Sequence, residues 1–158
     1  MGHRFGFADP AGDLETERRP RARHARNRRA AESPVSDLDF AQACRANILL
    51  IGAESAVSHL VCSLWGSFDE PLMIRRAGEL LRLPPSSEPV GTMIIHGVET
   101  LTDYEQRALQ DWLLLRNGTT RVVSTASASL LPMVEAGVFS DSLYYRLNVV
   151  CIDLSTRR

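Results

Sequence analysis

The sequence contains no lysine, since all 18 basic side chains among its 158 residues are arginine. Without an ammonium side chain, the protein cannot form a lysine Schiff base or use a lysine as general base. It also lacks the lysine that contacts the β- and γ-phosphates of a nucleotide in a phosphate-binding loop. Several large enzyme classes are excluded by this absence. Genome composition is the simplest origin of the bias, but the chemical exclusion holds whatever the origin.

Cysteines and long hydrophobic runs are also scarce. The three cysteines, Cys44, Cys62 and Cys151, are an odd number without CxxC spacing, which argues against a disulfide framework or a zinc site. No apolar run approaches 18 residues, and no hydrophobic segment follows Met1 or the twin arginines at 18–19. We therefore expect a soluble protein of the reducing cytoplasm, without a membrane partner.

The formal net charge of −1 conceals an uneven distribution. Residues 1–32 contain 8 Arg and 5 acidic residues, whereas residues 33–158 contain 10 Arg and 14 acidic residues. Seven of the arginines lie within residues 18–29. We expect a disordered Arg-rich arm over residues 1–34 and one folded domain over residues 35–158. Contact between the 18–29 arm and DNA phosphates is one interpretation of these charges, and a solvated tail or a misassigned start codon is the simpler one.

Short apolar runs alternate with helical patterns along the folded part. Strands are predicted over residues 47–51, 71–74, 92–95, 121–124 and 149–152, and helices over residues 37–45, from 103 to a stop at 117–118, near 131–136 and over 141–147. Ser36 is the expected N-cap of the first helix, and Thr102 with Glu105 forms a capping box at the second. The predicted buried face of that second helix contains Tyr104, Ala108, Trp112 and Leu115. This alternation predicts an α/β fold with a parallel sheet covered on both faces.

In such a sheet, ligands bind at the carboxyl ends of the strands, so the residues after each strand are informative. The first strand leads through Gly52 into a segment that contains His59, where a phosphate loop would have glycines and a terminal cation. The third strand ends in His96 and Gly97, where a nucleotide hydrolase has carboxylates for Mg²⁺ and water. The fourth strand ends in residues 125–127, where a polar side chain can face the same crevice.

Two strings in the C-terminal half carry a family resemblance. Val134-Glu135-Ala136-Gly137-Val138-Phe139 and Leu143-Tyr144-Tyr145-Arg146-Leu147-Asn148-Val149-Val150 strongly resemble the AAA+ ATPase domain of bacterial sigma-54-dependent transcriptional activators. With a weaker match at 47–55, the resemblance covers residues 46–154. It implies a P-loop NTPase-like core with a five-stranded parallel sheet of order 5-1-4-3-2. Because the sequence stops just after the fifth strand, we expect this core without the family's helical lid.

The resemblance also shows which family residues are replaced. The family's phosphate loop resembles Gly-Glu-Ser-Gly-Thr-Gly-Lys-Glu, and the matching residues 53–60 have lost all three glycines and the lysine. His96 and Gly97 match the family's Asp-Glu pair, Ser127 matches an Asn, and Ser140 matches one of two arginines that reach a neighbouring subunit. The resemblance therefore implies no catalytic residue, and a vestigial nucleotide site made of Ala53, Glu54, Ser55, Ala56, Ser58, His59, His96 and Ser127.

These losses predict a pseudo-ATPase, not an enzyme, that acts in transcription regulation through protein contacts and needs no cofactor. The retained Arg146 is the candidate intersubunit arginine, which would reach into the pocket of a genuine activator subunit, and an internal salt bridge is the alternative for it. The other readings are ATP binding without hydrolysis, a small-ligand module, a transition-metal site at His59 and His96 with Glu54 nearby, and a decayed fragment.

Overall fold

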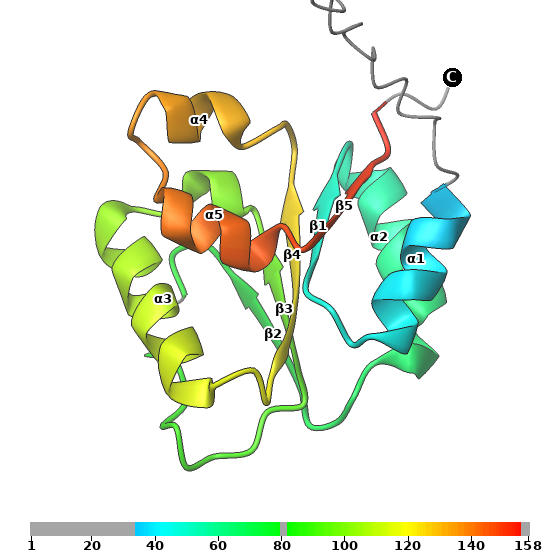
Figure 1. The fold of residues 1–158 in the computed structure, drawn as a ribbon, viewed down its shortest axis with the longest axis horizontal. Coiled ribbons are helices and arrows are strands. Elements are labelled where there is room, and N and C mark those ends of the chain that lie inside the picture. The colour runs from blue at the N-terminus through cyan, green and yellow to red at the C-terminus, as the bar shows by residue number, and fades with distance from the viewer. Residues whose placement is uncertain (1–33, 80–81, 156–158) are drawn as a thin grey trace, which may run out of the picture. The chain divides into compact units, whose positions relative to one another are not determined.

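The structure is a computed structural model that describes residues 34–79 and 82–155, so the predicted arm lies outside the described residues except for Pro34. Five parallel strands form one sheet in the order β2-β3-β4-β1-β5 (Figure 1). The strands are β1 (Ile48–Ile51), β2 (Leu72–Arg76), β3 (Thr92–His96), β4 (Arg121–Ala126) and β5 (Val150–Asp153). The order implied by the family resemblance, and the α/β class predicted from the alternating pattern, are both confirmed.

Helices cover both faces of the sheet (Figure 1). They are α1 (Pro34–Ala43), α2 (Glu54–Leu64), α3 (Asp103–Arg116), α4 (Leu131–Glu135) and α5 (Asp141–Leu147), with short 3-10 turns η1 (Trp65–Ser67) and η3 (Val98–Thr100). Figure 1 shows α1 and α2 against one face and α3 with α5 against the other. None of these helices in the described ranges is long and apolar enough to cross a membrane.

The sheet divides the core into two apolar clusters. Along β1, Leu49 and Ile51 belong to the cluster under α3 and α5, whereas Ile48 and Leu50 belong to the cluster under α1 and α2. Successive side chains of a strand point to opposite faces, so a strand covered on both faces needs at every position either an apolar side chain or a hydrogen-bonded polar one, such as Ser124 of β4. This requirement explains why β1 appears in the sequence as an unbroken apolar run.

Two strands extend two residues further at their carboxyl ends than the apolar pattern predicts, and β3 and β5 extend one residue further. β2 continues past the predicted end at 74 to Arg76, and β4 continues past 124 to Ala126. Backbone pairing with β3 extends to these residues, since Arg76 and Thr125 both lie in register with His96. The ladder hydrogen bonds do not depend on side-chain polarity, which is why hydrophobicity alone placed the strand ends too early. The added residues of β2 and β4 lie at the candidate site.

The predicted N-terminus of α1 is wrong. The expected helix ran over residues 37–45 with Ser36 as N-cap, but α1 begins at Pro34 and ends at Ala43, so Ser36 lies inside its first turn. Proline is favoured at the first helical position because its missing N–H has no partner there in any helix. The helix ends before Arg45, which adopts a left-handed conformation with φ of +52°.

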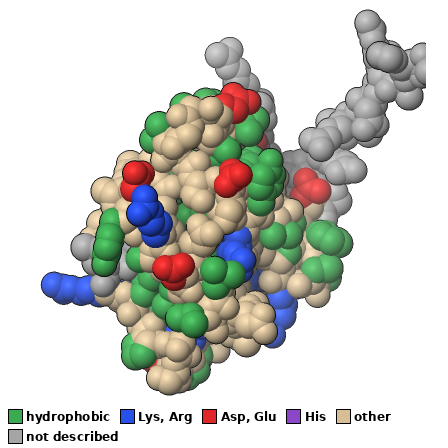
Figure 2. All heavy atoms as spheres, turned by 60° about the vertical axis from the view of Figure 1, so that its left-hand side comes forward, with side chains coloured by type: hydrophobic (Ala, Val, Ile, Leu, Met, Phe, Trp, Pro, Cys, Tyr) green, Lys and Arg blue, Asp and Glu red, His purple; other side chains and the backbone are tan. Residues whose placement is uncertain are grey.

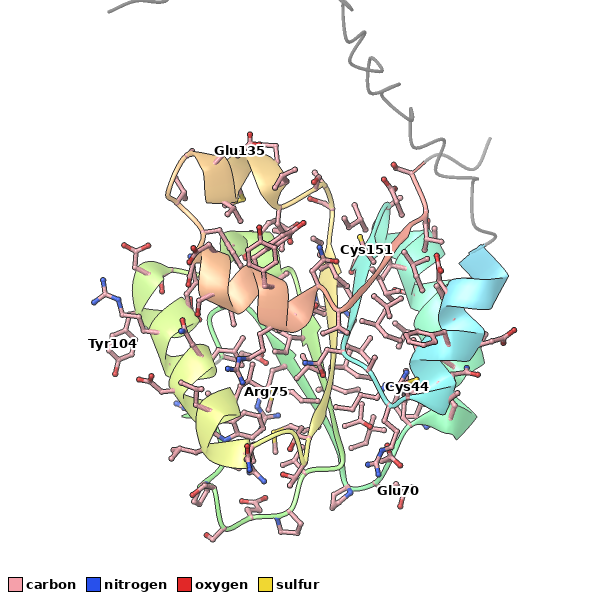
Figure 3. The ribbon with its side chains drawn as sticks, in the orientation of Figure 1. Cys44, Glu70, Arg75, Tyr104, Glu135 and Cys151 are labelled. Carbon is pink, nitrogen blue, oxygen red and sulfur yellow. The ribbon has the colours of Figure 1, made fainter. Side chains whose placement is uncertain are left out.

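The capping box of α3 and the burial of Trp112 are confirmed, but the predicted buried face is wrong at Tyr104 and Leu115. Tyr104 and Leu115 are 70% and 71% exposed, and Tyr104 points away from the rest of the molecule in Figure 3. The buried positions of α3 are Glu105, Gln106, Leu109, Trp112, Leu113 and Arg116. Polar members of this set are buried because they hydrogen-bond: the Gln106 side chain donates to the carbonyls of Leu101 and Val138. A pattern of apolar residues cannot reveal such a face.

Candidate functional site

A cavity of about 320 Å³ lies at the carboxyl edge of the sheet, where the sequence analysis expected a ligand site. Its walls come from the ends of β2, β3 and β4, from the turn after β1, from the first turns of α2 and from η3. The lining residues are Gly52, Glu54, Val57, Ser58, Arg76, Ala77, His96, Gly97, Glu99, Thr100, Thr125, Ala126 and Ser127. The cavity therefore occupies the place that the resemblance assigns to a nucleotide.

Half of the vestigial nucleotide-binding residues reach this cavity. Glu54, Ser58, His96 and Ser127 line it, whereas Ala53, Ser55, Ala56 and His59 do not. His59 is exposed on α2, although it matches the family's phosphate-binding lysine. The separation follows from helix geometry, because positions 54 and 58 share one helix face and position 59 lies about 100° further round. His59 thus lies outside the lining of the cavity that contains His96.

The segment that matches the phosphate loop is a helix. Only Gly52 and Ala53 separate β1 from α2, and the Val57 N–H already donates to the Ala53 carbonyl at 3.0 Å. A phosphate loop keeps successive N–H groups directed at the anion. Here the N–H groups from Val57 onward donate to carbonyls within the helix instead. The Val57 side chain is 3% exposed and belongs to the core under α1 and α2. The carboxylate of Glu54 also lies in the first helical turn, where an anion would otherwise be stabilised.

His96 is a half-buried imidazole at the end of β3. The Thr125 Oγ1 lies 3.3 Å from its Nδ1 and 3.4 Å from the Gly97 N–H, which donates to that oxygen. Burial lowers the pKa of His96 and the nearby Arg76 charge lowers it further, while Glu54 opposes the shift. The imidazole is therefore neutral at pH 7. The Thr125 hydroxyl lies within hydrogen-bond distance of both the His96 Nδ1 and the Gly97 N–H, and it holds the imidazole at the edge of the cavity.

The sequence analysis missed both charged residues that line the cavity beside Glu54 and His96, namely Glu99 and Arg76. The Glu99 Oε1 accepts a hydrogen bond from the Ser127 N–H at 2.9 Å, and its Oε2 is buried without a hydrogen-bond partner among the described residues. Gly97 turns the chain into η3 with a φ of +74°, which places Glu99 back over the sheet edge. An acidic residue two positions after a strand-end glycine was the signal available in the sequence.

The metal alternative is wrong for the part of the chain that the structure describes. It required His59, His96 and Glu54 to approach one ion. Within residues 34–79 and 82–155, no group of three His, Cys, Asp or Glu side chains could hold a metal ion. His59 fails this requirement because it does not line the cavity.

Arg146 lies at the opposite end of β1 from the cavity. Its backbone carbonyl accepts a hydrogen bond from the Asn47 side chain at 2.8 Å, and Asn47 directly precedes β1. The side chain is half-buried and makes no ion pair with another described residue, so the alternative of an internal salt bridge is wrong within the described ranges. The guanidinium of Arg146 is therefore remote from the cavity of its own chain.

Comparisons with solved structures agree with the fold. NtrX from Brucella abortus in complex with ADP matches with a TM-score of 0.58 at 16% identity, over 77% of this chain and 34% of that one. The P-loop NTPase domain of the sigma-54 transport activator from E. coli matches with a TM-score of 0.52 at 13% identity, over 78% of this chain and 96% of that domain. The chain thus spans about a third of the NtrX protein. At these identities the likeness concerns the fold alone.

No curated protein matches the sequence. The model of the sigma-54 interaction domain family matches residues 35–156, which is most of the chain. The five-stranded sheet order agrees with an AAA+, P-loop NTPase-like core. Both findings lead to one assignment: the chain belongs to the sigma-54 interaction domain family.

Proposed function

We propose that this protein is a pseudo-ATPase of the sigma-54 interaction domain family, which regulates transcription through protein contacts and does not hydrolyse ATP. One observation carries the proposal. The segment where the family has its phosphate loop is the first turns of α2, and the Val57 N–H bonds to Ala53 instead of facing a ligand. The protein therefore lacks the backbone cradle as well as the lysine.

The chemistry of the cavity supports the same conclusion. Phosphoryl transfer needs a metal ion and positive groups around the transferred phosphate. At the end of β3, His96 and Gly97 replace the carboxylates, and Glu54 and Glu99 add negative charge to the β1–β4 side of the cavity. A phosphate there would be repelled by both carboxylates. Loss of one such catalytic group typically costs about 10²-fold in rate, and several are lost here together.

Titration of the natural protein with Mg-ATP by calorimetry tests the nucleotide part of the proposal. We expect no saturable binding below about 1 mM nucleotide, which corresponds to less than about 4 kcal/mol of binding free energy. Micromolar binding would contradict the proposal and would favour the alternative of ATP binding without hydrolysis.

Arg146 and its neighbours supply the proposed contact surface for other AAA+ activator subunits. Tyr145 and Val149, which are close to Arg146 in the sequence, are 68% and 57% exposed, and the Arg146 guanidinium has no ion pair in the described ranges. Exposed aromatic and arginine side chains are the residues that dominate protein interfaces. Figure 2 shows the molecule from the side on which α3 lies, where hydrophobic side chains form separate patches and no continuous apolar surface. We therefore expect a modest contact in which the arginine has a large share.

Size-exclusion chromatography of a mixture with an active activator subunit tests this contact. We expect co-elution at micromolar concentration, lost in Arg146→Ala and kept in Arg107→Ala, which removes an exposed arginine from α3. Two separate peaks for the natural protein would contradict the proposed contact with activator subunits.

Two further parts of the proposal concern location and DNA. A cytoplasmic location is supported by Cys44, Cys62 and Cys151, which are all unpaired and exposed. DNA contact by residues 18–29 stays a prediction that falls outside the described residues. It would appear as steeply salt-dependent DNA binding that disappears when residues 1–33 are deleted.

A further inference from the structure

The cavity at the sheet edge has charged side chains of opposite sign on its two sides. Arg76 lies at the end of β2, His96 follows on β3, and Glu99 is bound over the end of β4 by the Ser127 N–H. Glu54 completes the series beside β1, at the start of α2. Neighbouring strands are about 4.8 Å apart, so the β2 and β4 backbones are separated by about 10 Å. The cavity thus has one cationic side and one anionic side.

Each side of the cavity contains a charged group without an ion-pair partner on another described residue. The Glu99 Oε2 is buried and accepts no hydrogen bond from the described residues. The Arg76 guanidinium makes no ion pair within the described ranges, and only its backbone N–H has a protein acceptor, on Glu79. A buried acceptor that stays unpaired typically costs about 1–3 kcal/mol. The Arg76 side chain is exposed, so water solvates its guanidinium in the absence of a ligand. A ligand that donates to the Glu99 carboxylate and accepts from Arg76 would pair both groups once a rotation of the Glu99 side chain turns its enclosed Oε2 toward the cavity.

We propose that this cavity binds a small zwitterion, with its anionic group on Arg76 beside the His96 imidazole and its ammonium or guanidinium group on Glu99 and Glu54. A free amino acid is the simplest member of this class. The proposal does not depend on the protein contacts proposed above. It gives the former nucleotide position a different ligand class, whose binding would join the edge strand β2 to the first turn of α2.

The charges favour a zwitterion over ligands with one sign of charge. A dication would place one of its charges beside Arg76, and a dianion would leave Glu99 unpaired. A nucleotide would bring its phosphates to the side occupied by Glu99 and Glu54. The volume of the cavity also fits a small zwitterion, because about 320 Å³ is near the lower limit for pockets that bind small molecules.

Calorimetric titration of the full chain at low ionic strength tests the ligand class. The probes are the twenty amino acids, with 4-aminobutyrate and 6-aminohexanoate added because their charges are further apart. Putrescine, succinate and Mg-ATP serve as the dication, dianion and nucleotide. We expect saturable binding of at least one zwitterion below about 10 mM, a range that corresponds to weak but measurable binding. No binding by any zwitterion, or equal binding by putrescine or succinate, would overturn the proposal.

Matched variants locate the site. Glu99→Gln and Arg76→Gln are each expected to weaken binding of that zwitterion about 10-fold or more, because each removes a charge-assisted hydrogen bond. Arg75→Gln and Glu70→Gln are the controls. Arg75 alternates to the other face of β2 and donates to the Ile74 carbonyl, while Glu70 precedes β2 at the opposite edge (Figure 3). Equal weakening by the controls would show non-specific attraction and would also overturn the proposal.

Two further measurements complete the test. Thermal unfolding without ligand checks that each variant folds. If Glu99→Gln does not fold, Glu54→Gln, which changes an exposed residue of the same side of the cavity, takes its place. The Mg-ATP arm separates the two proposals. Nucleotide binding would contradict the pseudo-ATPase, whereas the zwitterion titration and its variants decide this inference by themselves.

Discussion

Restoring the family's key side chains should not by itself restore nucleotide binding. The double variant His59→Lys, His96→Asp supplies the missing cation and one carboxylate. However, residue 59 lies on α2 outside the cavity lining, so its ammonium would not face a phosphate placed at the sheet edge. Binding would first require the beginning of α2, from Glu54 to Ser58, to unwind into a loop.

The cost of this unwinding follows from what the turn buries. Val57 is 3% exposed, and removing such a side chain from the core costs about 1.5–3 kcal/mol. The hydrogen bond from the Val57 N–H to the Ala53 carbonyl adds about 1 kcal/mol. The total of about 2.5–4 kcal/mol corresponds to roughly 10²–10³-fold weaker binding than a preformed loop would give.

A second variant isolates this contribution. Replacing residues 53–60 by Gly-Glu-Ser-Gly-Thr-Gly-Lys-Glu, together with His96→Asp, removes Val57 from the core and introduces two glycines into the helix. Each of these glycines weakens the helix by about 1 kcal/mol. In calorimetric titrations with Mg-ATP, we expect this loop variant to bind at least about 100-fold more tightly than the double variant. Equal micromolar affinities for the two variants would refute the reasoning that the helical turn prevents binding.

Three further predictions concern the framework of the site. Glu105→Ala removes a buried carboxylate that accepts from two backbone N–H groups, and should lower the free energy of unfolding by about 2–5 kcal/mol in urea titrations. A loss below about 1 kcal/mol would contradict this account. Arg121→Leu removes a 3% exposed guanidinium that donates to two backbone carbonyls at and after α1, and should cost about 2–4 kcal/mol, with lost amide-exchange protection confined mainly to α1. Burial and the nearby arginine lower the pKa of His96 in the folded state, so the unfolded state binds more protons and stability should fall as the pH drops below about 6.5. His96→Gln should remove this part of the pH dependence, and an unchanged slope would show that His96 does not cause it.

Much of the fold could be predicted from local patterns in the sequence. Short apolar runs identified all five strands, because most strand positions that face the core are apolar. The buried Arg121 and Ser124 of β4 are exceptions that hydrogen bonds to backbone carbonyls allow. Thr102 and Glu105 fixed the start of α3, since a capping box is a contact between residues three positions apart. The replaced phosphate-loop residues were equally visible, as the absence of lysine excludes that chemistry in any fold. Strand order came from the family resemblance, since the local pattern does not contain it.

The composition of the cavity was decided only by the tertiary structure. Arg76 and Glu99 lie 23 positions apart in the sequence, and they line the same cavity because β2 and β4 flank β3 and a left-handed glycine turns Glu99 back over the edge. His59 and His96 were expected together, but the helical start of α2 directs His59 elsewhere. Local periodicity records which residues are buried. The convergence of strand ends and the direction of a side chain on a helix depend on packing between distant segments, which no single stretch of sequence contains.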